Sequence, residues 1–148
     1  MTTNALINAL QAIDAGKLAL SLGDSVAAAR HFESAAILAQ PNLSSEADET
    51  LELARFEALR LWGHTLTPWE QANHLTEVIL EASDSRTQAG TQMMFALHFD
   101  QAEAWGQVGG WKDALACYEL AYLDAVADKN SDAMARATAR ITQTKKNL

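Results

Sequence analysis

Residues 109–121, GGWKDALACYELA, begin with glycine and then place alanine, an aromatic residue and alanine at a regular spacing. The same order occurs 86 positions earlier, in residues 23–35, GDSVAAARHFESA. In both segments the first alanine follows the glycine by five residues, the aromatic by four more, and the second alanine by three more. Glycine can turn the chain between two antiparallel helices, and small residues let those helices approach closely around a large side chain. The repeated pattern therefore predicts helical hairpins.

The composition of the whole chain also favours helices. The 148 residues include 29 alanines and 19 leucines against 9 valines and isoleucines, and alanine and leucine favour helices where β-branched residues favour strands. An apolar fraction of 49% is too high for an intrinsically disordered chain. Thr67-Pro68-Trp69-Glu70 is a strong helix start, and weaker starts follow Ser45 and Ser85. We predict an all-α protein with seven helices at about residues 3–22, 25–40, 45–62, 68–82, 86–107, 111–127 and 131–146.

Two copies of the repeated pattern extend back into the preceding helix. They comprise Gly16, Gly23, Ala28, Phe32 and Ala35 in the first copy, and Ala102, Gly109, Ala114, Tyr118 and Ala121 in the second. This pattern resembles the tetratricopeptide (TPR) repeat. Between them a looser copy keeps Gly63 and Ala72 but has Thr76 in place of the aromatic residue.

The TPR resemblance implies a fold for the whole chain. It implies one domain over residues 1–148, a right-handed antiparallel helical-hairpin array. Three TPR-like hairpins would lie at about residues 3–40, 45–82 and 86–127, and a C-terminal capping helix at 131–146 would cover the open end of the array. The alternative is another all-α bundle built from the same hairpins.

Charge and apolar run lengths restrict the class of partner. Nineteen acidic residues against eleven lysines and arginines give a formal net charge of −8, which repels phosphate backbones, so we expect no nucleic-acid partner. The uncharged runs are shorter than the ~18–20 residues that a membrane-spanning helix needs, and the N-terminus lacks the basic segment of a signal peptide. The single cysteine, Cys117, permits no internal disulfide, which fits a reducing compartment. We therefore expect a cytoplasmic protein without a membrane partner.

The sequence offers no constellation of residues for catalysis. The four histidines lack metal-ligand spacing, and Cys117 lies in an apolar helix where a buried, inert thiol is expected. Gly109 and Gly110 lack the lysine and serine of a phosphate-binding loop. We predict that the protein is not an enzyme and needs no metal or cofactor.

The TPR resemblance further implies a binding groove. In that family the first helix of each hairpin lines a concave surface, and the positions that face it can be carried over to this sequence. The partner-binding residues implied in this way are Leu10, Ile13, Lys17, Leu20, Leu53, Glu57, Arg60, Phe99 and Glu103. Such a groove is apolar with charges of both signs, and it suits a peptide with apolar side chains. The alternative is that Leu10, Ile13 and Phe99 pack inside a closed bundle.

These observations lead to three hypotheses for the function. The first is a non-catalytic protein–protein interaction module, an adaptor or a client-holding chaperone, which binds a peptide or partner segment in the groove. The second is a helical protein whose apolar surface serves homo-dimerisation. The third, which the sequence favours least, is a small-ligand-binding helical bundle.

Overall fold

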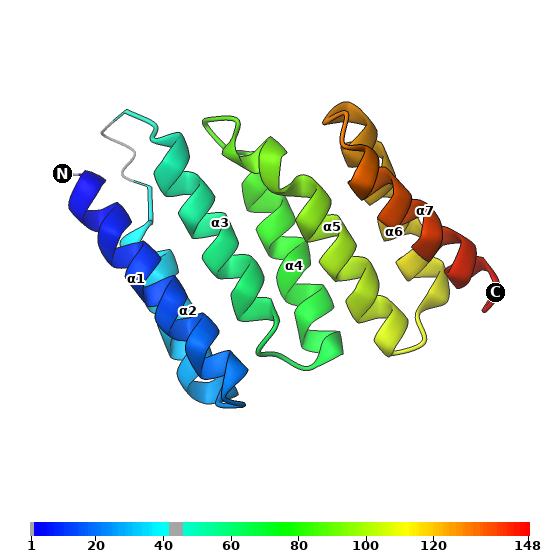
Figure 1. Ribbon diagram of the computed structural model, residues 1–148, viewed down its shortest axis with the longest axis horizontal. Coiled ribbons are helices and arrows are strands. Elements are labelled where there is room, and N and C mark those ends of the chain that lie inside the picture. The colour runs from blue at the N-terminus through cyan, green and yellow to red at the C-terminus, as the bar shows by residue number, and fades with distance from the viewer. Residues whose placement is uncertain (1, 42–45) are drawn as a thin grey trace. The chain divides into compact units, whose positions relative to one another are not determined.

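The computed structural model describes residues 2–41 and 46–148, and every regular element in this part of the chain is an α-helix (Figure 1). The helices are α1 (Thr2–Ser21), α2 (Ser25–Leu38), α3 (Glu49–Gly63), α4 (Pro68–Ser83), α5 (Ala89–Gln107), α6 (Trp111–Ala127) and α7 (Ser131–Lys145). The all-α prediction and the order of seven helices are confirmed for the described residues. Most helix ends predicted from the sequence lie within two residues of the helix ends in the structure. The predicted starts of α3 and α5 differ from the observed starts by more than two residues.

The start of α3 is set by an aspartate. Asp48 has an extended backbone, and its side chain accepts a hydrogen bond from Leu51 N at 3.1 Å, which satisfies one of the free N–H groups of the first turn. The helix therefore begins at Glu49, and the predicted start at Ser45 lies outside the described residues.

The start of α5 is displaced by a buried carboxylate. Glu52 of α3 accepts hydrogen bonds from the hydroxyl groups of Ser85 and Thr87 at 2.7 and 2.6 Å. Thr87 Oγ1 in turn accepts a bond from Ala89 N at 3.1 Å. These bonds hold residues 85–87 as a loop against α3, so the predicted helix start at residue 86 is wrong and α5 begins at Ala89.

The described chain divides into two compact units. Unit 1 comprises the described residues up to Leu66 together with Leu80–Met93, and unit 2 comprises Thr67–Ile79 with Met94–Leu148. Unit 1 therefore contains α1, α2 and α3, and unit 2 contains α6, α7 and most of α5. The single domain over residues 1–148 and its three hairpins stay predictions.

The core of unit 1 forms where α1 packs on α2. The phenyl ring of Phe32 is fully buried, and Ala28 and Ala35 beside it on α2 are fully buried as well. Gly16 of α1 lies directly against this ring, because a Cβ atom added at Gly16 would come within 2.5 Å of Phe32 Cε1. The close approach predicted for Gly16 is thus confirmed, and it depends on the absence of a side chain.

Arg55 links three helices of unit 1. Its guanidinium donates a hydrogen bond to the carbonyl oxygen of Ala36 at the end of α2 (2.7 Å) and two to the carboxylate of Glu81 in α4 (both 3.0 Å). A two-pronged arginine–carboxylate contact fixes geometry as well as charge. This contact holds α3 in place, so the face of α3 that meets α1 has a defined orientation.

Three inter-helix turns have the same backbone geometry. Gly23 and Gly109 have φ values of +80° and +77°, and Lys129 has a φ of 55°. In each turn the next residue donates its N–H to a carbonyl five residues back, as in Asp24 N to Ala19 O, Gly110 N to Trp105 O and Asn130 N to Ala125 O. This is the bond pattern that closes a helix with a left-handed residue. The turn roles predicted for Gly23 and Gly109 are confirmed, and Lys129 forms a third turn of the same kind.

Gly63 does not form such a turn. It is the last residue of α3, it is buried, and its backbone is helical. The chain leaves α3 through short-range bonds from Thr65 N to Trp62 O and from Leu66 N to Gly63 O. α4 then begins at the predicted start, where Glu70 N donates to Thr67 Oγ1 at 3.4 Å and Thr67 N donates to Glu70 Oε1 at 3.3 Å.

The core of unit 2 is aromatic and contains one buried amide. Phe99 packs edge-on against Tyr118, with ring centroids 5.4 Å apart, and Ala102, Ala114, Cys117 and Ala121 complete this cluster. Gln101 is buried beside it. Its amide donates to the carbonyl oxygen of Ala72 (3.0 Å) and to Thr76 Oγ1 (2.7 Å), and its oxygen accepts from the Cys117 thiol (3.5 Å). α7 packs on α6 at the end of this unit.

Candidate functional site

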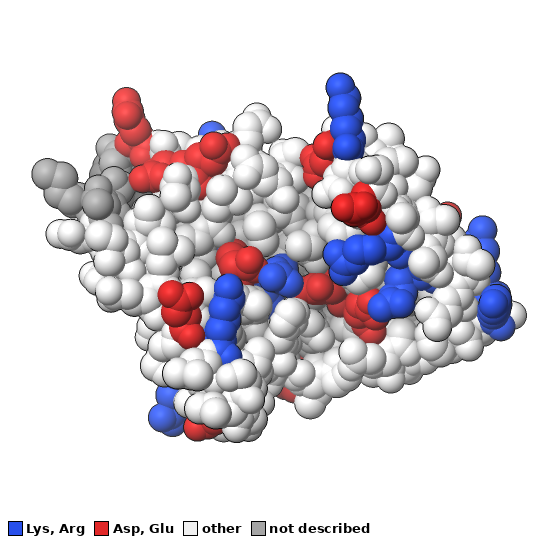
Figure 2. Space-filling model, viewed as in Figure 1, with Lys and Arg blue, Asp and Glu red and all other residues white. Residues whose placement is uncertain are grey.

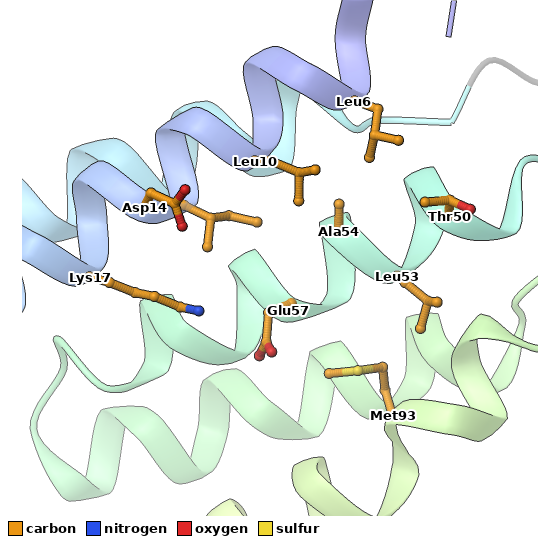
Figure 3. A pocket seen from close by; sticks show the side chains of 10 residues that line it. Leu6, Leu10, Asp14, Lys17, Thr50, Leu53, Ala54, Glu57 and Met93 are labelled. Carbon is orange, nitrogen blue, oxygen red and sulfur yellow. The ribbon is translucent and has the colours of Figure 1, made fainter. Parts of the chain in front are cut away.

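Unit 1 contains an open cavity of about 370 Å³ between α1, α3 and the first turn of α5 (Figure 3). Its lining is mainly apolar and consists of Leu6, Leu10, Ile13, Asp14, Lys17, Thr50, Leu53, Ala54, Glu57 and Met93. A cavity of this size and composition can take two or three apolar side chains of a ligand or partner.

Helical periodicity brings these residues to one surface. On α1, the positions 6, 10, 13 and 17 recur every three or four residues and therefore share one face. On α3, the positions 50, 53, 54 and 57 do the same. Ile13 forms the base, with 4% of its surface exposed, whereas Leu10 stands at the rim with 46% exposed. The cavity thus offers apolar surface that the fold itself does not cover.

The charged side chains gather at one end of the cavity. Figure 3 shows Asp14, Lys17 and Glu57 toward one end, while Leu6 and Thr50 lie at the other. The Glu57 carboxylate also accepts from the Arg60 guanidinium at 2.7 Å, one turn along α3. Arg60 does not line the cavity and instead holds Glu57 in position. Asp14 and Glu57 thus lie beside Lys17 and Arg60, so this end of the cavity carries charges of both signs.

Five of the nine predicted partner-binding residues line this one cavity: Leu10, Ile13, Lys17, Leu53 and Glu57. Leu20, three residues beyond Lys17 on α1, is half-buried and does not line it. The nine do not include the other five lining residues, which are Leu6, Asp14, Thr50, Ala54 and Met93. Leu6 could have been found because it precedes Leu10 by one helical turn, but Met93 comes from α5, and no local pattern relates it to α1.

The two remaining predicted residues lie in unit 2. Phe99 belongs to the core cluster, and its exposed fraction of 6% leaves almost no surface for a partner. For this residue the alternative of core packing holds. Glu103 accepts a hydrogen bond from Arg140 Nε at 2.9 Å and lines a separate cavity of about 340 Å³ in unit 2.

The titratable groups of unit 2 are arranged as structural contacts. Burial, together with the nearby Asp113 carboxylate, raises the pKa of Cys117 to about 11, so the thiol is protonated and unreactive near neutral pH. His98 Nδ1 lies 2.6 Å from Asp124 Oδ2 and joins α5 to α6. Among the described residues, no group of three or more His, Cys, Asp and Glu side chains is placed to hold a metal ion.

The comparisons with known proteins add no relative. Neither a protein-family model nor a curated protein nor a solved structure matches the chain. Within the described residues, no helix has both the length and the apolar character needed to cross a membrane.

Proposed function

We propose that this protein is a non-catalytic interaction module, a TPR-like adaptor or client-holding chaperone, which binds an apolar peptide segment in the cavity of unit 1. The observation that carries the proposal is the convergence of Leu10, Ile13 and Leu53 on one open, largely apolar cavity. Exposed apolar surface of this kind is commonly an interaction site. The single cysteine supports a reducing compartment such as the cytoplasm.

Charge complementarity defines the occupant more closely. Asp14 and Glu57 lie at one end of the cavity, and the chain as a whole carries a formal charge of −8. A partner segment with two or three leucine-sized side chains and a lysine or arginine at one end would match this distribution. Each leucine-sized side chain that becomes fully buried contributes about 1.5–3 kcal/mol before the costs of association, so we expect modest affinity.

The proposal can be tested by selecting ligands from a random peptide phage library on the full chain. We expect the selected peptides to share apolar residues three or four apart with an adjacent basic residue. We expect Leu10→Glu to abolish their binding, because it places a carboxylate at the apolar rim. The matched control is Leu18→Glu on the same helix, since Leu18 is 62% exposed and does not line the cavity.

Both variants should fold, because both side chains are substantially exposed, and circular dichroism checks this directly. Loss of binding in Leu10→Glu together with retention in Leu18→Glu supports the proposal. Peptides that bind the wild type and Leu10→Glu equally would place the interaction elsewhere and overturn it.

A second candidate is homo-dimerisation, which one observation favours. Leu120, Leu123 and Val126 lie exposed along α6, with 61% of Leu123 accessible. A stripe of this kind can pair with its copy in a second chain. Light scattering across a range of concentrations distinguishes the two candidates, because a monomer at all concentrations excludes the dimer and leaves the peptide-binding proposal intact.

A further inference from the structure

Arg136 of α7 has an unusual environment for an arginine in an acidic protein. Its guanidinium carbon lies 4.6 Å from the centroid of the Phe99 ring and 5.8 Å from that of Phe95. Stacking against an aromatic face favours one orientation of the guanidinium and leaves its N–H groups at the edges of the plane. The aromatic contact therefore restricts this exposed side chain before any ligand arrives.

Arg136 has no carboxylate partner in the part of the chain that the structure describes. Arg55, Arg60 and Arg140 each bind a glutamate at 3.0 Å or less. Within the described residues Arg136 makes no ion pair, although the sequence contains nineteen acidic residues. Its charge is consequently uncompensated, and its N–H donors remain available to an anion from outside.

The surroundings of Arg136 are locally basic. α7 carries one acidic residue, Asp132, against Arg136, Arg140 and Lys145. Figure 2 shows lysine and arginine side chains, with acidic side chains among them, over the part of the molecule where Figure 1 places α7. The formal net charge of −8 therefore does not describe α7 itself, on which three cationic side chains stand against one carboxylate.

Arg140 extends the site into a neighbouring cavity. Its guanidinium carbon lies 6.0 Å from the same Phe99 ring, and Glu103 holds its Nε. The cavity beyond it, of about 340 Å³, is lined by Trp111, Tyr118 and the amide side chains of Gln107, Gln143 and Asn147, among others. Amide side chains both donate and accept hydrogen bonds, so this cavity suits a polar group that is covalently attached to the anionic group of a ligand.

We propose that unit 2 binds a carboxylate-bearing ligand. Arg136 binds the carboxylate, and the cavity beside Arg140 holds the rest of the ligand, which is polar. Two parallel N–H···O bonds from a guanidinium match a carboxylate in plane and spacing. Phe99 and Glu103 then act through the arginines, since Phe99 supports Arg136 and Glu103 holds Arg140. This site is independent of the peptide cavity in unit 1, and its ligand has the opposite charge.

The experiment observes the arginine side chains of the full chain directly. In ¹⁵N-labelled protein, the Nε–H resonance of Arg136 is followed during titration with three probes: glutarate, N-acetyl-triglutamate amide and the uncharged N-acetyl-triglutamine amide. We expect a saturable shift at Arg136 with a carboxylate probe and none with the glutamine peptide. A response to glutarate identifies a small dicarboxylate as sufficient, whereas a response to the glutamate peptide alone identifies a protein segment as the source.

Variants test whether the anchor is specific. Arg136→Gln lacks the Arg136 Nε–H, so binding to this variant is followed at the Nε–H of Arg140, which lines the adjoining cavity. Arg136→Gln should weaken the binding of the responding probe about tenfold or more, because it removes two charge-assisted bonds. Arg30→Gln, at an exposed position of α2 in unit 1, removes the same charge elsewhere and should change the affinity less than about twofold. Arg136→Lys, which keeps the charge but not the planar fork, provides a variant that still covers Phe99 if Arg136→Gln does not fold.

Three results would overturn the proposal. One is the absence of a saturable shift at Arg136 with either carboxylate probe. Another is an equal loss of affinity in Arg136→Gln and Arg30→Gln, which would indicate general charge attraction. The third is equal binding of the glutamine peptide, which would show that the carboxylate is not recognised.

Discussion

Replacing Gly16 tests the packing of unit 1 most directly. In Gly16→Ala the new Cβ would lie 2.5 Å from Cε1 and 2.7 Å from Cδ1 of Phe32. The Phe32 ring is fully buried, so it can move only by displacing other core side chains. Overpacking of this kind costs about 1–3 kcal/mol, and the better helix propensity of alanine offsets about 0.8–1 kcal/mol of that cost. We expect the free energy of unfolding to fall by about 1 kcal/mol.

Gly106→Ala is the matched control, because Gly106 also lies inside a helix but has room for a side chain. A Cβ there would lie 3.5 Å from Trp111 Cζ3, an ordinary van der Waals contact. Helix propensity then dominates, and we expect stabilisation of up to about 1 kcal/mol.

The assay is urea unfolding of the full chain followed by circular dichroism, with thermal unfolding as a second readout. For a chain of this size, 1 kcal/mol corresponds to a shift in Tm of about 2–4 °C. The two glycine variants should shift Tm in opposite directions. If both raise stability by similar amounts, Phe32 leaves space at Gly16, and the reasoning from the close contact is refuted.

Three further predictions concern single residues. Lys129→Gly should raise the free energy of unfolding by up to about 1 kcal/mol in the same urea assay, because glycine adopts a φ of 55° without the strain of a side chain; a loss of stability would contradict this. Burial raises the pKa of Glu52, but the hydroxyls of Thr87 and Ser85, together with the backbone N–H and the charge of Arg86, lower it by more, so its folded pKa lies below 4.5. Its ionised form therefore stabilises the fold above about pH 4.5, and the stability difference between the wild type and Glu52→Gln should shrink as pH falls below that value, whereas a pH-independent difference would argue against the buried contact. Cys117 should react with a thiol reagent at pH 8 far more slowly than the unfolded chain does, because its pKa of about 11 leaves little thiolate, and equal rates would show that the thiol is accessible.

The helices and their close contacts follow from local sequence. The spacing from Gly23 to Ala28, Phe32 and Ala35 predicts a turn followed by a buried helix face, and the structure has both. Such patterns can be read from the sequence because helix periodicity and turn preference act over a few residues. The same reasoning failed at Gly63, where glycine ends a helix without a left-handed turn, because a glycine can adopt that conformation but is not obliged to.

The features that sequence reasoning missed depend on residues far apart in the chain. α5 starts late because Glu52 binds Ser85 and Thr87, more than thirty positions further along. Lys129 is an exception, because local bonds from Lys129 N to Val126 O and from Asn130 N to Ala125 O hold it in a conformation that its residue type does not favour.

The residues of the candidate site also fall into those that local sequence patterns could place and those that they could not. Leu10, Ile13 and Lys17 share one face of α1, so the TPR resemblance and helix periodicity could place them together. Phe99 fits the same positional rule, yet it is buried, because whether a face is covered depends on which helix packs over it. The stacking of Arg136 on Phe99 across 37 positions had no signal in the sequence beyond a basic last helix.

The buried amide of Gln101 fixes the register of two helices. α5 can slide along α4 only in whole helical turns if its side chains are to repack, and each such step would move Gln101 away from Ala72 O and Thr76 Oγ1. A buried amide that loses its partners costs about 1–3 kcal/mol per group, whereas a purely apolar contact would tolerate the slide at much smaller cost. Unit 2 therefore favours one alignment of α4 against α5, and a slide by a whole turn would have to leave the buried amide of Gln101 without these partners.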